Sequence, residues 1–423
     1  MSKKLVSLDD AKRILKQKFS AEPVGTEYAP LSEAYQCVLA KDIVAHIDVP
    51  SFNRATVDGY AVRAKDTFGA DETNPITLKI CGRISVGESP RTTVENGSAA
   101  EIATGAPIPQ GADAVIMLEY TIRKNANVIL YRPVSIGENV MKSGSDIRKG
   151  VMILKKGQML SSLEIGVLAA LGLAKVEVYK RPKVAIISTG PEIVEPGKPL
   201  PSGKIYDINA HTLNAAVLEC GGQPFYLGIV PDEADKLEAA IRKALDSADI
   251  VITSGGVSAG PRDIIPEILN SLNENGIIID GIAVKPGKPT TIAIVDKKPI
   301  FSLPGHPTSS LLMFHILVRP IIGKMAGKTQ EPSPSTKAIT VEKMFSEKGR
   351  RTFIMVNLSK DKTGRTLTSP VPTGLSGAIT TLTKAEGFIE IPENQQFINS
   401  GEEVKVYLLK PILALSFIEK GFR

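Results

Sequence analysis

Apolar runs and amphipathic segments alternate along the chain between residues 179 and 329. The apolar runs have the length and continuity of buried strands, and they lie at residues 183–189, 223–230 and 248–253. The segments between and after them repeat their apolar residues at helical spacing, and they lie at residues 207–222, 232–248 and 263–272. Strands that are apolar throughout and alternate with helices predict a doubly wound α/β domain with a parallel sheet.

The segments on both sides of this domain have other patterns of apolar and polar residues. One helix is predicted after Ser7, a capping residue ahead of an amphipathic stretch, and another at residues 161–173. Short β-runs with glycine, proline and asparagine between them favour an inserted domain, and later β-runs favour a small barrel or sandwich. We therefore expect a helical linker part at 1–46 plus 146–178, an inserted β-rich domain at 47–145, an α/β domain at 179–329 and a C-terminal β-barrel domain at 330–423.

Three glycine-containing loops follow predicted strands of the α/β region. They read TSGGVSAG at 253–260, KPGKP at 285–289 and LPGHPTS at 303–309. Ligands bind beyond the carboxyl ends of strands in such sheets, and glycines let backbone amides approach an anion closely. Lys285 and Lys288 add positive charge on a stiff turn. The pattern favours a site for an anionic ligand, although a glycine-rich loop can also be a tight strand–helix connection.

Two carboxylates stand where predicted helices begin at the same edge of the sheet. Asp232 and Asp263 could each serve simply as a helix N-cap. Two carboxylates that converge on an anionic ligand also favour Mg²⁺ between them, and capping and metal binding are compatible roles. Two further aspartates lie outside this domain: Asp58 in an Asp-Gly turn typical of a hairpin, and Asp146 in a Ser-Gly-Ser-Asp loop.

Composition narrows the class of protein. The chain has 423 residues and a net charge of +6, from 51 basic and 45 acidic residues, without a Lys/Arg-rich block that would indicate nucleic-acid binding. Its three scattered cysteines favour a reducing cytosol. The longest apolar run, 311–318, is too short to span a bilayer, and the N-terminus lacks a signal-peptide core. We expect a cytoplasmic protein without nucleic-acid or membrane partners.

Seven motifs, in order along nearly the whole chain, resemble those of the MoeA family of molybdopterin molybdenumtransferases, whose fold also forms the E domain of gephyrin-like proteins. They read NRATVDGYAV, SGSDIRKG, STGPEI, DINA, TSGGVSAGPRD, VKPGKP and SLPGHPTSS. The resemblance implies a Mg²⁺-dependent enzyme of molybdenum cofactor biosynthesis. Such an enzyme inserts molybdate or tungstate into adenylylated molybdopterin and releases AMP.

The resemblance also implies an L-shaped subunit that forms a homodimer through its linker part, with the active site between subunits. The α/β domain would bind molybdopterin, and molybdopterin adenylyltransferase and apo-molybdoenzymes would be partners. The implied catalytic residues are Asp58 and Asp146 from the partner subunit's inserted region, together with Glu192, Asp232 and Asp263, the last two as metal ligands. The implied substrate-binding residues are Thr189, Gly190, Ser254, Gly255, Gly256, Ser258, Lys285, Lys288, Pro304, Gly305, Ser309, Arg350 and Ser376.

The sequence departs from the family pattern at Ile208, Pro191, His306 and Met355. Two other functions remain open at this point. A molybdopterin carrier or scaffold would bind the pterin without turnover, and a molybdopterin adenylyltransferase would use the α/β domain alone. The additional β domains argue against the adenylyltransferase.

Overall fold

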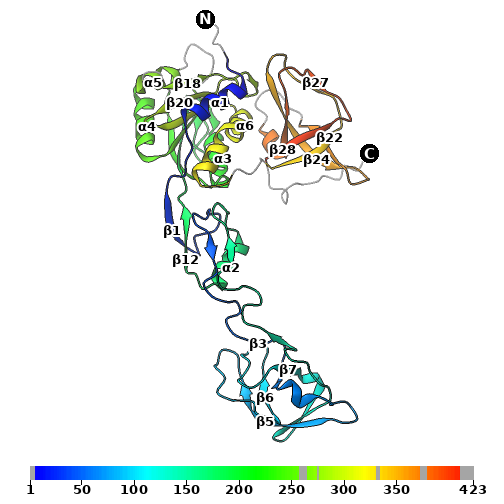
Figure 1. The fold of residues 1–423 in the computed structure, drawn as a ribbon. Coiled ribbons are helices and arrows are strands. Elements are labelled where there is room, and N and C mark those ends of the chain that lie inside the picture. The colour runs from blue at the N-terminus through cyan, green and yellow to red at the C-terminus, as the bar shows by residue number, and fades with distance from the viewer. Residues whose placement is uncertain (1–4, 257–263, 274–275, 330–333, 372–378, 410–423) are drawn as a thin grey trace.

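The computed structural model describes residues 5–256, 264–273, 276–329, 334–371 and 379–409. The molecule is elongated. The α/β domain and a β-barrel lie side by side at one end, and a narrow neck connects the α/β domain to a distal β lobe (Figure 1). No helix in the described ranges combines the length and the apolar character that a bilayer crossing requires.

A six-stranded sheet forms the centre of the α/β domain. Its strand order is β16 (Gln223–Val230), β13 (Lys183–Thr189), β17 (Ile250–Ser254), β21 (Lys298–Leu303), β20 (Thr291–Val295) and β18 (Ile277–Asp280). The first four strands are parallel, whereas β20 is antiparallel to both β21 and β18. A tight turn joins β20 to β21, with φ of 48° at Asp296 and 64° at Lys297. The sheet is therefore mixed at one edge, where the sequence predicts a parallel sheet.

Helices cover both faces of this sheet, which confirms the doubly wound α/β prediction. On one face α3 (Asn209–Glu219) and α6 (Pro307–Met313) contribute to the larger core, and on the other α4 (Ala234–Ser247) and α5 (Ile265–Leu272) form a second core. The π-helical turn η3 (Phe314–Val318) and α7 (Arg319–Met325) continue from α6. A short ribbon of β14 (Ile193–Val194) and β15 (Ile205–Tyr206) follows β13.

Helix α1 (Leu8–Lys18) begins after Ser7, whose hydroxyl accepts a hydrogen bond from the Asp10 amide at 3.1 Å. Leu8, Ala11 and Leu15 are buried in the larger core of the α/β domain. The first helix therefore packs on the sheet and not in the linker. Helical periodicity identifies an apolar face, but it does not identify the surface that covers this face.

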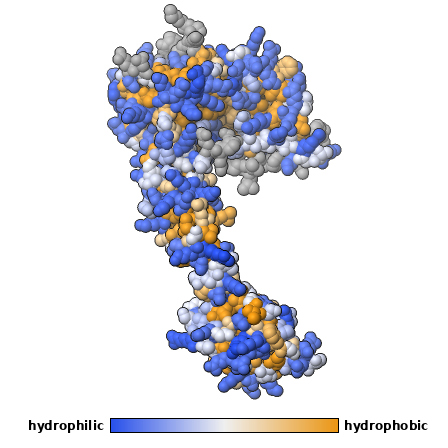
Figure 2. Space-filling view, in the orientation of Figure 1, coloured by the Kyte–Doolittle hydropathy of each residue, from blue (hydrophilic) through white to orange (hydrophobic). Residues whose placement is uncertain are grey.

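The neck is mostly extended, where the sequence predicts helix. It pairs β1 (Thr26–Pro30) with β12 (Lys175–Tyr179) and β2 (Ile43–Val44) with β11 (Met152–Leu154). Its helix, α2 (Ser162–Ala170), begins with a capping box between Ser161 and Glu164. Apolar side chains gather on the surface of the neck (Figure 2), and the exposed ones include Tyr28, Tyr35, Val44, Met152 and Leu163.

The distal lobe is a curled six-stranded sheet inserted between the two halves of the neck. Its order is β7 (Ala114–Met117), β4 (Gly59–Val62), β6 (Ser98–Ile102), β5 (Ile76–Ile84), β9 (Asn127–Leu130) and β8 (Thr121–Lys124). The ribbon of β3 (Arg54–Ala55) and β10 (Val140–Met141) joins it to the neck, and the short turns η1 (Ala64–Thr67) and η2 (Leu118–Tyr120) complete the lobe.

The C-terminal domain is a closed barrel. Its strands are β24 (Arg351–Lys360), β25 (Thr366–Pro370), β22 (Ser335–Thr340), β28 (Glu403–Leu408) and β26 (Gly387–Ile391), and pairing of β26 with β24 closes the circle. The ribbon of β23 (Met344–Phe345) and β27 (Phe397–Ile398) and the short helix α8 (Thr380–Lys384) lie beside it. One further strand, β19 (Val284–Lys285), comes from the α/β domain and pairs with the start of β24.

Arg351 stabilises the junction between the α/β domain and the barrel. It forms ion pairs with Asp9 of α1 at 2.6 Å, Glu390 at 3.1 Å and Glu393 at 3.0 Å, and its side chain is only 13% exposed. These carboxylates raise the pKa of the guanidinium, the hydrogen bond to Asp9 most strongly. The α/β domain, α1 and the barrel are therefore joined by charge and by strand pairing.

Candidate functional site

The topology places the switch point of the sheet between β13 and β17. The chain leaves β13 for β16 on one side and then returns to β17 on the other side of β13. Loops that leave neighbouring strands in opposite directions open a crevice at this switch point, and ligands bind there in doubly wound sheets. Thr189 ends β13 and Ser254 ends β17, so the predicted residues Thr189, Gly190, Ser254, Gly255 and Gly256 are brought together.

The glycines in this crevice allow backbone segments to approach closely. Gly255 has φ +100°, and a Cβ there would lie 2.1 Å from the carbonyl oxygen of Thr189. Gly305 lies against Gly255, because a Cβ on Gly305 would be 3.7 Å from the Gly255 Cα. The Gly255 amide also donates to the carbonyl of Leu303, the last residue of β21, at 3.3 Å. The first and third predicted loops therefore meet, with Gly305 exposed and Pro304 buried.

Asn209, at the start of α3, links these two loops. Its Nδ2 donates to the hydroxyl of Ser254 and to the carbonyl of Gly305, both at 2.7 Å. Asn209 is not among the site residues expected from the sequence, although its motif, DINA, is one of those that carry the resemblance. Asp207, two residues earlier, accepts a hydrogen bond from the Ala210 amide in the first turn of α3 at 3.0 Å. Asp207 also accepts a hydrogen bond from the Tyr226 hydroxyl at 2.8 Å. The pKa of Tyr226 is raised, mainly by burial of its hydroxyl and also by this hydrogen bond to the Asp207 carboxylate.

Two of the predicted carboxylates lie beside the end of β13. Asp232 accepts a hydrogen bond from the hydroxyl of Thr189. It does not cap α4, because Glu233 occupies the N-cap position and makes no capping hydrogen bond with its side chain. The carboxylate of Glu192 folds over Gly190, where an added Cβ would lie 2.8 Å from Oε2. Both carboxylates therefore flank Thr189 and Gly190.

The predicted cationic residues form a second group at the junction with the barrel. Lys285 and Arg350 both bind the carboxylate of Glu347, at 3.0 Å and 2.8 Å. The hydrogen bond from Lys285 lowers the pKa of Glu347 most strongly, and the charges of Lys285, Arg350 and Lys288 lower it further. Pairing of β19 with β24 brings these residues together, since Lys285 lies opposite Thr352.

Helix α6 connects the crevice to this cationic group. Its first residue, Pro307, lies two residues after Gly305, and its last residue, Met313, lies against Gly287 of the Lys-Pro-Gly-Lys loop. Seven residues of helix span about 10 Å. Ser309 is buried on this helix. The crevice and the cationic group therefore lie at the two ends of one short helix.

The remaining predicted residues lie elsewhere. Asp58 is in the distal lobe, where it is exposed and accepts from the Thr104 amide at 2.8 Å. Asp146 is exposed at the start of the return to the neck, and its amide donates to the carbonyl of Val49 at 3.2 Å. The distal lobe lies at the opposite end of the neck from the sheet of the α/β domain (Figure 1). Ser258, Asp263 and Ser376 lie outside the described residues.

Several buried polar atoms near the crevice have no hydrogen-bond partner within the described part of the chain. They are Asn209 Oδ1, Thr253 Oγ1, Ser302 Oγ, His306 Nε2 and Ser310 Oγ. Each such group costs about 1–3 kcal/mol if it stays unpaired. These atoms gather at the ends of β17 and β21 and around α6. A bound ligand or ordered water at this edge of the sheet can form hydrogen bonds with them and so offset the loss of stability.

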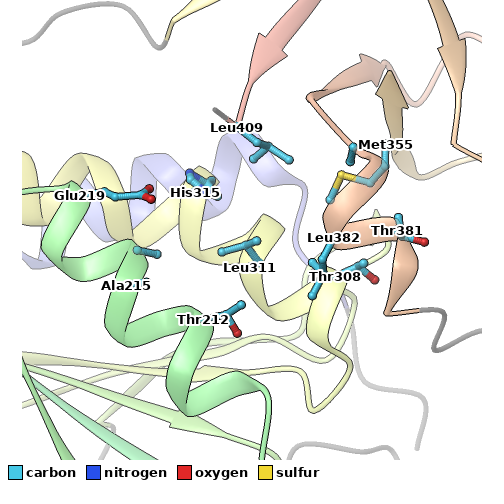
Figure 3. Close-up of a pocket in the computed structure, with 12 residues that line it drawn as sticks. Thr212, Ala215, Glu219, Thr308, Leu311, His315, Met355, Thr381, Leu382 and Leu409 are labelled. Atoms are coloured by element: carbon cyan, nitrogen blue, oxygen red, sulfur yellow. The ribbon is translucent and has the colours of Figure 1, made fainter. Parts of the chain in front are cut away.

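A separate apolar hollow of about 170 Å³ lies between α3, α6 and the barrel. Figure 3 shows Leu311 and His315 on one side of it and Leu409 and Met355 of the barrel on the other. Burial, and secondarily the charge of Arg319, lower the pKa of His315 to about 4. This hollow carries one carboxylate, Glu219, and it lacks the glycine loops that characterise the crevice.

A doubly wound sheet with glycine loops at its switch point and a cationic group nearby is the arrangement with which α/β proteins bind anionic ligands. Residues 6–172 match the MoeA N-terminal region (domain I and II), residues 185–324 a probable molybdopterin binding domain, and residues 337–409 the MoeA C-terminal region (domain IV). The chain belongs to the MoeA family.

Named relatives and solved structures agree with this assignment. The chain is 35% identical to a molybdopterin molybdenumtransferase of Bacillus subtilis over 389 residues, which cover 91% of this chain and 90% of the relative. It is 35% identical to a putative molybdopterin biosynthesis protein of Methanocaldococcus jannaschii over 422 residues, covering 96% and 99%. The crystal structure of a molybdopterin biosynthesis MoeA protein from Pyrococcus horikoshii superimposes with a TM-score of 0.82 at 42% identity, covering 96% and 100%.

Proposed function

We propose that this chain is a molybdopterin molybdenumtransferase. It inserts molybdate or tungstate into adenylylated molybdopterin and releases AMP during molybdenum cofactor biosynthesis. The observation that supports this most directly is the arrangement of a glycine-lined crevice and a cationic group at the two ends of α6. The reaction brings together two anions, a phosphate-bearing pterin and a small oxyanion. The glycine loops could bind the first, and the cationic group could bind the second.

In this proposal the crevice binds the adenylylated pterin. The glycine backbone around Gly255 and Gly305 would let the phosphates approach closely, and Asn209 holds the two loops at a fixed separation. Lys285, Lys288 and Arg350 concentrate the oxyanion near the dithiolene. Holding the two reactants in one geometry, with positive charge where negative charge gathers, lowers the barrier to their combination.

Magnesium fits the carboxylates beside Thr189. Within the described ranges no group of three or more histidine, cysteine, aspartate or glutamate side chains is arranged to hold a metal ion. Mg²⁺, however, commonly uses only one or two carboxylates and completes its shell with water and substrate phosphates. We assign Asp232 as one ligand, with Glu192 beside it and Asp263 as the second ligand expected from the sequence. The ion would polarise the phosphoanhydride that releases AMP.

We also propose that the enzyme works as a homodimer in the cytoplasm. The exposed apolar residues on the neck, including Tyr28, Tyr35 and Leu163, provide a surface that association would bury. Asp58 and Asp146 cannot serve the crevice of their own subunit in this extended shape, so they would reach the crevice of the partner. Molybdopterin adenylyltransferase would supply the substrate, and apo-molybdoenzymes would receive the product.

An AMP-release assay with molybdate and tungstate supplied separately tests the activity. Purified protein, adenylylated molybdopterin and Mg²⁺ should release AMP only when an oxyanion is present, with many turnovers per subunit. A carrier or scaffold would instead bind the pterin stoichiometrically without oxyanion-dependent AMP release. Formation of adenylylated molybdopterin from ATP would identify an adenylyltransferase. Either of these two results would reject the proposed activity.

A further inference from the structure

The cations assigned to the oxyanion already bind an anion that belongs to the protein. Glu347 lies in the turn between β23 and β24, and its two carboxylate oxygens bind Lys285 from the α/β domain and Arg350 from the barrel. Lys288 adds a third positive charge that acts on the same carboxylate. A carboxylate between these cations stands where an incoming oxyanion would have to bind.

We propose that Glu347 is a built-in competitor for the oxyanion, so that it sets the concentration of molybdate or tungstate at which the site fills. In the empty site its carboxylate neutralises Lys285 and Arg350. The oxyanion binds by displacing that carboxylate, and Glu347 then turns into solvent. This inference rests on the proposed function, because it takes the cationic group to be the oxyanion site.

The contacts of Glu347 are exchangeable. The side chains of Lys285, Glu347 and Arg350 are 60%, 37% and 32% exposed. Ion pairs this open to water contribute only about 0–1 kcal/mol each, so a divalent anion can displace the carboxylate at small cost. Arg351, one residue later, contrasts with them, because its side chain is largely buried among three carboxylates and fastens the domain junction.

The cations do not depend on Glu347 for their position. Lys285 is held by strand pairing opposite Thr352, and the Arg351 amide donates to the Ala283 carbonyl at 3.1 Å. The turn that carries Arg350 is closed by main-chain atoms of Glu347: its carbonyl accepts from the Arg350 amide at 3.2 Å, and its amide donates to the Thr352 hydroxyl at 3.1 Å. Removing the carboxylate leaves these contacts in place.

Glu347→Gln in the full chain tests the proposal, with Glu393→Gln as the matched control. Both changes remove one negative charge from the same domain, but Glu393 binds Arg351 and not the proposed site. Molybdate binding is measured by calorimetry at pH 7, and the molybdate concentration for half-maximal AMP release is measured in parallel. Glu347→Gln should tighten molybdate binding about three- to tenfold, whereas Glu393→Gln should change it less than about twofold.

A Glu347→Gln variant that does not bind molybdate more tightly than the wild type would overturn the proposal. If Glu347→Gln weakens molybdate binding, the carboxylate positions the cations for the ligand, and if binding is unchanged or both variants gain equally, Glu347 does not compete. Lys285→Met separates this failure from failure of the proposed function. If Lys285→Met weakens binding while Glu347→Gln does not tighten it, only the competition is wrong. If Lys285→Met has no effect either, the oxyanion site itself is wrongly assigned.

Discussion

The hydroxyl of Thr189, the last residue of β13, donates a hydrogen bond to the carboxylate of Asp232, which lies between β16 and α4. This contact turns Asp232 toward the switch-point crevice and leaves α4 without a side-chain cap. The carboxylate of Asp232 is therefore exposed and yet held in place beside the end of β13.

We expect Asp232→Asn to slow AMP release by about a hundredfold, as loss of one positioned charge does in other active sites. The melting temperature should change little, because the residue neither caps the helix nor lies in the core. Steady-state AMP release and a thermal melt of the same sample measure both quantities. A lower melting temperature with full activity would assign Asp232 a structural role instead.

Gly255→Ala should damage both the fold and the site. The new Cβ would lie 2.1 Å from the Thr189 carbonyl oxygen, at a residue whose φ is +100°. Gly364→Ala is the matched control, because Gly364 has φ +84° but no atom within 4 Å of an added Cβ. Left-handed backbone alone should cost the control about 1–2 kcal/mol. Chemical denaturation should show a clearly larger loss for Gly255→Ala, and equal losses would mean that the β13 and β17 loops separate easily.

Lys288→Met should raise the molybdate concentration for half-maximal AMP release by about ten- to a hundredfold, since a charge-assisted contact contributes about 1.5–3 kcal/mol. Affinity for molybdopterin should change much less, because the crevice amides make that contact. Lys243→Met, on the exposed face of α4, controls for the loss of one positive charge. Equal losses for oxyanion and pterin would show that Lys288 holds the phosphate or the pterin.

Asp58→Ala and Asp232→Ala subunits should complement each other. Each homodimer should be inactive, whereas a mixed dimer should contain one crevice with an intact Asp232 and an intact Asp58 from the other subunit. Refolding equal amounts of the two variants together should recover about a quarter of the wild-type activity, because half of the dimers are mixed and each has one complete site. Mixed dimers without activity would place both residues in the site of a single subunit.

His315 should make the protein less stable as the pH falls. Its pKa is about 4 in the folded protein and 6.5 when unperturbed, so between these values the unfolded chain takes up a proton that the folded protein excludes. Stability should therefore decrease from about pH 7 to pH 4, by at most about 3 kcal/mol from this residue. Thermal melts of wild type and His315→Gln across this range measure the effect, and parallel pH profiles would show that His315 is accessible to protons in the folded state.

Local sequence patterns located most strands and helices but not their partners. The run at 183–189 matches β13 residue for residue, and Ser7 caps α1 as its spacing indicates. Periodicity could not tell that α1 packs on the sheet, because Leu8 and Leu15 would be equally apolar against any core. The β20–β21 hairpin was missed for a related reason, since short apolar runs do not encode strand direction.

Loop chemistry in the sequence pointed to part of the candidate site. Glycine loops and lysines identified Gly255, Gly305 and Lys285, and the structure brings the first two together. Asn209 was missed because an asparagine at a helix start looks like local capping, and its contacts to Ser254 and Gly305 cross the fold. Glu347 was missed because nothing in a turn between two strands reveals a lysine that approaches from another domain.

The short strand β19 follows the chain of the α/β domain but belongs to the sheet of the barrel. A connection through main-chain hydrogen bonds resists rotation, so this joint is rigid where many multidomain enzymes have a hinge. In the proposed enzyme, side chains such as Glu347 would therefore move to admit the oxyanion. In the proposed homodimer, the neck is the connection that would bend, because, of the described elements, only the β1–β12 and β2–β11 pairs and α2 lie between the α/β domain and the distal lobe.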